Sequence, residues 1–154
     1  MCNVEYNHVM KENLYSQIDA IIDKSLPLVS NLSNVSSILN KMEDINWCGF
    51  YLVDKDTLYL GPFQGDAACT RISKGKGVCG TSFLEKKTVI VDDVTTHPNH
   101  IACSSLSRSE IVTPIIKDDE VKGVIDIDSP ITSRFTNEDK IFLEKVASLL
   151  SKLF

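Results

Sequence analysis

Apolar positions in the first forty residues recur every three or four residues, which is the period of a helix. They include Met10, Leu14, Ile18, Ile21 and Ile22. Charged and amide side chains lie between them, so an amphipathic helix is predicted. The pattern breaks at Ser25-Leu26-Pro27, because the residue before a proline avoids the helical region of backbone space. A second, more polar helix is predicted over residues 28–39.

From Asn46 the apolar period changes to two, which is typical of strands. Residues 47–53 are aromatic and β-branched, residues 54–56 have turn composition, and residues 57–60 return as the second strand of a hairpin. Further strands are predicted over 88–91, 111–117 and 120–128. The last two are joined by a short polar link, which favours antiparallel pairing.

The last segment is predicted to be a helix that begins at Thr136. Glu138 and Asp139 lie in its first turn, where the helix dipole favours anions. Its apolar stripe comprises Ile141, Phe142, Val146, Leu149, Leu150 and Leu153. The pattern predicts an α+β fold, a single domain over residues 1–154, in which the N-terminal and C-terminal helices pack on one side of an antiparallel sheet.

Composition and charge narrow the class of protein. The chain has 154 residues, 43% of them hydrophobic and 24% charged, as in an ordinary globular domain. No apolar stretch approaches the roughly 18–20 residues of a membrane helix, and the N-terminus does not resemble a secretory signal. The net charge of −5 argues against nucleic acid and anionic membranes as partners. We therefore expect a cytoplasmic protein.

The candidate chemistry begins with five cysteines, namely Cys2, Cys48, Cys69, Cys79 and Cys103. An odd number without a signal peptide argues against a secreted disulfide framework. No C-x-x-C pair is present, so a structural zinc site is not expected. In a reducing compartment such thiols pack as small hydrophobes, bind metals or carry redox chemistry.

Residues 61–80 form a glycine-rich stretch of the kind that often makes a mobile functional loop. Gly75, Gly77 and Gly80 match G-x-G-x-x-G, but polar residues precede the motif and the expected sheet is antiparallel, so a dinucleotide site is not predicted. A short helix that starts near residues 78–80 would place Cys79 at its N-terminus, where the dipole stabilises a thiolate. The alternative for Cys79 is a small residue that packs behind the loop.

Cys103 lies in a polar segment beside His97 and His100. A cysteine near imidazole groups is more reactive than one in a core. The alternative is a metal site made from the two histidines and one or two thiols, although the spacing matches no common zinc pattern. We expect no metal.

Asp126 and Asp128 are two residues apart on a predicted strand, so both carboxylates project from one face, and Glu110 opens the preceding strand. Buried together, they require a cation or shared protons, and a substrate ammonium is one candidate. Exposed, they would be ordinary surface charges. On the first strand, Gly49 between Trp47 and Tyr51 is predicted to leave a gap for a small apolar or sulfur-bearing group, although core packing explains the same pattern.

Taken together, these residues resemble the GAF-domain free methionine-(R)-sulfoxide reductases. The resemblance covers about residues 46–142 and rests on an ordered set of motifs. They are Asn46-Trp47, Gly49-Phe50-Tyr51, Gly61-Pro62-Phe63-Gln64-Gly65, Ala68-Cys69, Gly75-Lys76-Gly77-Val78-Cys79-Gly80-Thr81, Asp92-Asp93-Val94, His100-Ile101-Ala102-Cys103, Ser109-Glu110-Ile111-Val112 and 123–130. Cys69, Cys79 and Cys103 are ten and twenty-four residues apart, as in the family.

The resemblance implies a role for each matching residue. Cys103 is similar to the nucleophile, Cys69 to the resolving cysteine and Cys79 to a second thiol in disulfide exchange. The carboxylates that bind substrate and protonate its oxygen correspond to Glu110, Asp126 and Asp128, and the wall around the S-methyl group to Trp47 and Tyr51. The implied reaction passes through a cysteine sulfenic acid and a disulfide, uses thioredoxin as reductant and needs no cofactor.

The chain departs from the family pattern at Ser104, where the family often has an aspartate, and Cys2 and Cys48 have no implied role. Cys48 is predicted to face away from Trp47 and Tyr51. The alternatives to an enzyme are a ligand-sensing GAF module and a redox or metal sensor. The oligomeric state stays open, with a homodimer through the two terminal helices as one arrangement.

Overall fold

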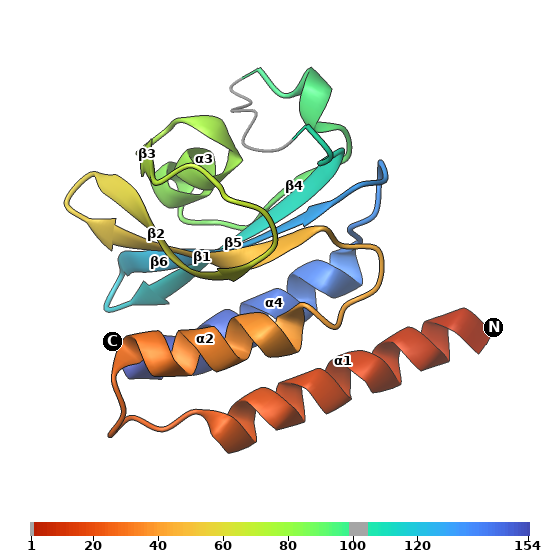
Figure 1. Ribbon diagram of the computed structural model, residues 1–154, viewed down its shortest axis with the longest axis horizontal. Coiled ribbons are helices and arrows are strands. Elements are labelled where there is room, and N and C mark those ends of the chain that lie inside the picture. Colours follow the sequence, from red (N-terminus) through yellow and green to blue (C-terminus); the bar gives the residue numbers. More distant parts are fainter. Residues whose placement is uncertain (1, 99–104) are drawn as a thin grey trace.

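A six-stranded antiparallel sheet forms the centre of the molecule (Figure 1). The computed structural model describes residues 2–98 and 105–154. The spatial order of the strands is β3-β2-β1-β6-β5-β4. Their bounds are β1 Trp47–Asp54, β2 Thr57–Gln64, β3 Arg71–Ser73, β4 Val89–Val91, β5 Ser109–Lys117 and β6 Glu120–Ser129. The predicted hairpins β1–β2 and β5–β6 are confirmed, and β1 pairs with β6 at the middle of the sheet.

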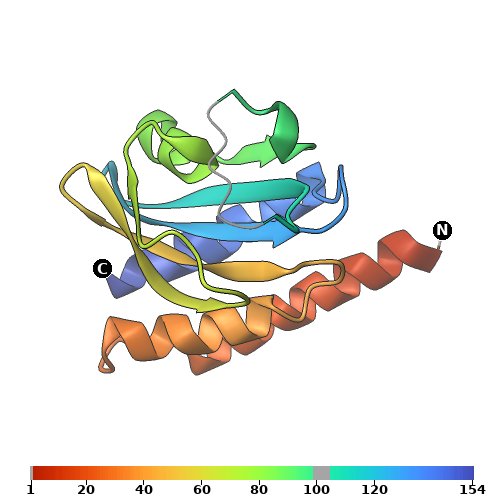
Figure 2. The same cartoon turned by 45° about the horizontal axis from the view of Figure 1, so that its top comes forward.

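The helices divide between the two faces of the sheet (Figures 1 and 2). One face is covered by α2 (Leu28–Leu39) and α4 (Asn137–Leu150), and α1 (Cys2–Ile21) packs against these two helices from outside (Figure 1). The 3-10 turn η2 (Ser151–Leu153) follows α4. The other face carries α3 (Gly77–Glu85) and the 3-10 turn η1 (Val94–Thr96). The predicted placement of the N-terminal and C-terminal helices on one side is confirmed. No described helix combines the length and apolar character needed to cross a bilayer.

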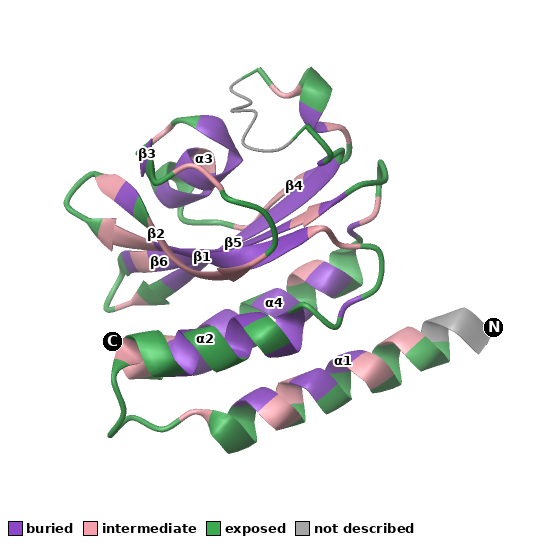
Figure 3. Ribbon diagram, in the orientation of Figure 1, coloured by how far each residue is buried: buried purple, intermediate pink, exposed green. Residues whose placement is uncertain are grey.

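The alternation of side chains along β1 produces two separate cores. Buried residues accordingly occur in α2 and α4 on one side of the sheet and in α3 on the other (Figure 3). Cys48 and Phe50 point toward α1, α2 and α4 and belong to the larger core. Trp47 and Tyr51 point to the opposite face and pack in a second core that includes Phe83 of α3. The sheet therefore has one face for stability alone and another face that combines packing with polar groups.

The stretch over residues 61–80 is more ordered than a single loop, which corrects the sequence-based expectation. Strand β2 continues to Gln64, and β3 adds a short edge strand, so only residues 65–70 connect the two. The register between β1 and β2 shifts opposite Gly49 and Tyr51. This irregularity is a β-bulge, which accommodates the turn-forming pair Gly61-Pro62 inside a strand.

Candidate active site

Strand register places three carboxylates side by side on the face that carries α3. Glu110 on β5 lies directly opposite Asp128 on β6, and Asp128 lies opposite Trp47 on β1. Asp126, two residues earlier on β6, lies opposite Gly49. Glu110 and Asp126 are buried and Asp128 is half-buried. Like charges at such cross-strand positions repel each other, so this arrangement does not arise for stability.

Helix α3 brings a thiol against the carboxylates. Cys79 is the third residue of α3 and is buried. Its Sγ atom and carboxylate oxygens of Glu110 and Asp126 all lie within 4.8 Å of one another. Among the described residues this trio is the group whose ligand atoms are close enough to hold a metal ion.

Burial raises the pKa values of the carboxyl groups. It raises the pKa of Asp126 to about 6, while hydrogen bonds from Glu110 and Cys79 oppose the increase. Burial, together with the neighbouring charge of Asp126, raises the pKa of Glu110 and of Asp128 well above the usual range. The folded chain therefore favours the protonated forms of Glu110 and Asp128 beside Asp126.

The predicted position of Cys79 at a helix N-terminus is confirmed, but the expected stabilisation of its thiolate is not. Burial first, and then the charges of Asp126 and Glu110, raise the pKa of the Cys79 thiol well above its usual value. Desolvation and two carboxylates outweigh the helix dipole here. Cys79 is a protonated thiol in this state of the molecule.

An aromatic wall borders the carboxylates, with Trp47 between two other rings. The centroid of the Trp47 ring lies 6.0 Å from that of Tyr51 and 5.3 Å from that of Phe63. The gap predicted at Gly49 is not present, because a Cβ atom there would lie 2.4 Å from the Phe63 Cβ and 2.8 Å from the Trp47 ring. Gly49 instead permits close approach of β2, and the open space lies beside the wall.

Polar atoms of the wall hold the connection between β2 and β3 over the site. The indole Nε1 of Trp47 donates a 3.0 Å hydrogen bond to the backbone oxygen of Asp66. The hydroxyl of Tyr51 donates a 2.9 Å hydrogen bond to the backbone oxygen of Cys69. Both aromatic residues thus combine an apolar wall with a tether for residues 65–70.

A pocket of about 40 Å³ lies between α3, the sheet and this connection. It is lined by Trp47, Tyr51, Asp66, Ala67, Ala68, Ile72, Gly77, Val78, Cys79, Ser107, Glu110, Asp126 and Asp128. The pocket therefore gathers the residues predicted to bind substrate, namely Trp47, Tyr51, Glu110, Asp126 and Asp128. A single water needs roughly 10–15 Å³, so the pocket as it stands holds only a few small atoms.

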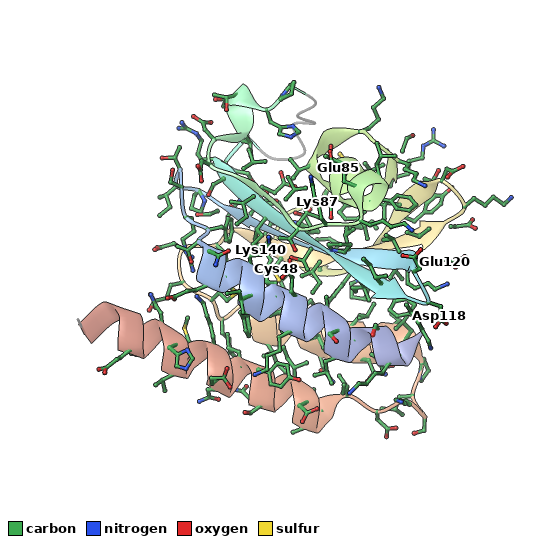
Figure 4. All side chains as sticks on the ribbon, turned by 180° about the vertical axis from the view of Figure 1, so that it is seen from behind. Cys48, Glu85, Lys87, Asp118, Glu120 and Lys140 are labelled. Atoms are coloured by element: carbon green, nitrogen blue, oxygen red, sulfur yellow. The ribbon has the colours of Figure 1, made fainter. Side chains whose placement is uncertain are left out.

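The remaining cysteines occupy different surroundings. Cys69 is disulfide-bonded and half-buried in the connection that covers the pocket. Cys48 is a free thiol, fully buried on the opposite face between the sheet and α4 (Figure 4), as predicted. Cys103 and His100 lie outside the described residues, so the predicted nucleophile and the alternative histidine metal site stay predictions.

Two polar residues near the site were not predicted from the sequence as individual site residues. Ser107 lines the pocket, and the side-chain amide of Asn46 donates a 3.2 Å hydrogen bond to its hydroxyl oxygen. These residues are sixty-one positions apart and become neighbours only when β1 pairs with β6. Asn46 stood in a family motif, but no local pattern indicated Ser107.

Comparison with known proteins agrees with this geometry. The chain matches the GAF domain family over residues 27–153. It is 42% identical to the free methionine-R-sulfoxide reductase of Escherichia coli over 142 residues, which cover 92% of this chain and 86% of that protein. It is 47% identical to the free methionine-R-sulfoxide reductase of Saccharomyces cerevisiae over 150 residues, covering 92% and 83% respectively.

A solved structure gives the same result. The fold matches the X-ray structure of the Neisseria meningitidis free methionine-R-sulfoxide reductase in complex with its substrate, with a TM-score of 0.89 and 44% identity. The match covers 94% of this chain and 87% of the Neisseria chain. By sequence and by fold, the chain belongs to the GAF-domain free methionine-R-sulfoxide reductase family.

Proposed function

We propose that this oxidoreductase converts free L-methionine-(R)-sulfoxide to L-methionine by thiol chemistry, with Cys103 as the nucleophile. The observation that carries the proposal is the buried cluster of Glu110, Asp126 and Asp128 beside an aromatic wall. A domain of this size does not retain such a cluster for packing, because each buried carboxylate needs a proton or a cation. The relatives named above are reductases of this substrate.

The cluster and the wall account for binding of the free amino acid. The ionised Asp126 and its neighbours attract the ammonium group, and the rings of Trp47 and Tyr51 contact the S-methyl group. A methionine sulfoxide inside a peptide has no ammonium group and would leave the carboxylates unpaired, so it is rejected. The pocket is too small for the substrate as it stands, and entry therefore requires residues 65–70 to move outward.

The proposed chemistry follows from the protonation of the cluster. The Cys103 sulfur attacks the sulfoxide sulfur while a protonated carboxyl group of the cluster donates to the sulfoxide oxygen, which lowers the barrier to breaking the S–O bond. Loss of the protonated oxygen as water leaves methionine joined to Cys103 as a sulfonium through the new S–S bond. Water then attacks the Cys103 sulfur and breaks that bond, so the products are methionine and a cysteine sulfenic acid. Raised pKa values at Glu110 and Asp128 keep the necessary protons available at neutral pH.

A second thiol then completes the cycle. Cys69 attacks the sulfenic acid, which forms a disulfide and releases water, and Cys79 is the further thiol for exchange. A dithiol reductant of the thioredoxin type returns both cysteines to thiols by exchange. The disulfide-bonded state of Cys69 supports its redox role. This cycle requires a reducing compartment such as the cytoplasm, and no cofactor takes part.

Cysteine variants test the proposal. With a thioredoxin system, Cys103→Ser is expected to abolish release of methionine. Cys69→Ser is expected to release about one methionine per chain without external thiol and then stop, because the sulfenic acid is not resolved. The matched control Cys48→Ala removes a buried thiol on the opposite face and is expected to retain turnover. Full turnover by Cys103→Ser would refute the assignment of the nucleophile.

A further inference from the structure

We propose that Cys79, Glu110 and Asp126 form a binding site for one thiophilic divalent cation, with Zn²⁺ as the representative ion. The three residues come from α3, β5 and β6, so the site exists only in the folded chain. No step of the proposed reaction requires a metal. The site is therefore a second use of the same pocket.

The spacing of the three ligand atoms fits a metal ion after a small adjustment. They lie within 4.8 Å of one another. Zn²⁺ binds thiolate sulfur at about 2.3 Å and carboxylate oxygen at about 2.0–2.2 Å, which places tetrahedral ligands roughly 3.5 Å apart. The distances between the ligand atoms must therefore shorten by no more than about 1 Å. The pocket leaves room for a water molecule as the fourth ligand.

A buried oxygen without a partner points independently to a missing ligand. The Oδ1 atom of Asp126 has no hydrogen-bond partner among the described residues, and it is shielded from water because the residue is only 6% exposed. A buried acceptor without a hydrogen-bond partner reduces the stability of the fold by about 1–3 kcal/mol, and by more when the group is charged. None of the described residues that line the pocket is basic, so a cation satisfies this oxygen best.

A divalent cation suits these ligands better than a monovalent one. Thiol and carboxyl groups bind metal ions in their deprotonated form, so the three bound ligands would carry three negative charges. An ion with two positive charges compensates more of this charge inside the protein than an ion with one.

The sulfur ligand selects the kind of metal. Mg²⁺ and Ca²⁺ prefer oxygen ligands and gain little from a thiolate. A mixed set of one sulfur and two oxygens suits Zn²⁺ and, as a spectroscopic substitute, Co²⁺. If the pocket also binds substrate, a bound ion would exclude the ammonium group and inhibit turnover. This consequence alone rests on the proposed function.

The test uses a chain from which the other proposed redox thiols have been removed. In the full-length Cys69→Ser/Cys103→Ser protein, reduced and without substrate, we expect one Zn²⁺ per chain in competition with a chromogenic chelator. Co²⁺ is expected to give a thiolate-to-cobalt charge-transfer band. Because no turnover is measured, failure of this test and failure of the proposed reaction are distinguishable.

Additional substitutions in that background identify the ligands. Cys79→Ser is expected to weaken Zn²⁺ binding by at least about 100-fold and to remove the cobalt band. Asp126→Asn is expected to weaken binding while the band persists, and it decides the matter if Cys79→Ser does not fold. Cys48→Ala is the matched control and leaves both readouts unchanged. Absence of stoichiometric binding, or equal binding after Cys79→Ser, would overturn the proposal.

Discussion

Asp126 is the residue on which the electrostatics of the site depend. It is buried, it is hydrogen-bonded by Glu110 and Cys79, and its charge raises the pKa values of both neighbours. The fold therefore favours protonated carboxyl groups, whereas the unfolded chain ionises them near pH 4. Below about pH 4 the carboxyl groups are protonated in both states, so this stabilising contribution is fully present and does not change with pH. As the pH rises, the unfolded state gains charge first and the folded state loses stability.

We accordingly predict that the free energy of unfolding falls between about pH 4 and pH 6, by roughly 3 kcal/mol from Asp126 alone. Glu110 and Asp128 are expected to extend the decline to higher pH. Asp126→Asn should flatten this profile in urea denaturation measured at several pH values. The control Asp118→Asn changes an exposed residue of the β5–β6 turn (Figure 4) and should leave the slope unchanged. An unchanged slope in Asp126→Asn would contradict the account.

The carboxyl cluster could be predicted from the sequence because it depends on strand periodicity. Asp126 and Asp128 are two residues apart, and two neighbouring strands place Glu110 beside them. The filling of the space at Gly49 by Phe63 could not be predicted, because it depends on a bulge in the pairing of β1 with β2. Ser107 was not predicted because it lies in a loop before β5, where the sequence has no hydrophobic periodicity.

At the scale of elements, α1 is joined to the start of α4 by a buried ion pair. The Lys11 ammonium lies 3.0 Å from a carboxylate oxygen of Asp139, and both residues are buried. Asp139 also completes a capping box with Thr136 and pairs with Arg134 at 3.2 Å. Burial opposes its charge, yet the backbone of Thr136 and the Lys11 ammonium hold the pKa of Asp139 below its usual value.

We predict that Asp139→Ala destabilises the protein by about 3–5 kcal/mol, because it removes the cap and leaves the buried Lys11 with only the exposed Glu138, 3.8 Å away, as a counter-charge. The matched control is Glu12→Ala, which breaks an exposed pair with Lys145 between the same two helices. That variant should cost less than about 1 kcal/mol. Chemical denaturation at pH 7 measures both, and equal effects would show that the buried pair has no special role.

The connection of residues 65–70 is the second element with a defined tether. Tyr51→Phe removes the hydroxyl that binds the Cys69 backbone oxygen while retaining the ring in the wall. We predict faster hydrogen exchange of amides in residues 65–70 and little change in the sheet. Tyr59→Phe, at an exposed position on β2, is the control. Unchanged exchange in Tyr51→Phe would mean that this hydrogen bond does not hold the connection.

Most of the elements were predictable, and the exceptions have physical causes. The helices have long amphipathic stripes, and Pro27 and Thr136 mark the starts of α2 and α4. Strand β3 has only three residues, two of them polar and exposed, and this is too short for hydrophobic periodicity to predict a strand. The end of β2 was hidden because Gly61-Pro62 has the composition of a turn.

For the molecule as a whole, the two faces of the sheet have separate tasks. The core beneath α1, α2 and α4 is formed by apolar side chains, and its thiol, Cys48, is sealed from solvent. The core beneath α3 includes Cys79 and shares its space with Glu110 and Asp126, whose burial opposes stability. The fold therefore stabilises the domain from one face and places the chemistry on the other.

The central claim is that this arrangement reduces one epimer of a free amino acid sulfoxide. The direct test is release of methionine from the separate R and S epimers of free methionine sulfoxide, with the reduced full-length chain and a thioredoxin system. The account predicts turnover of the R epimer and none of the S epimer. Absence of turnover with either epimer, in protein whose thiols are shown to be reduced, would contradict it.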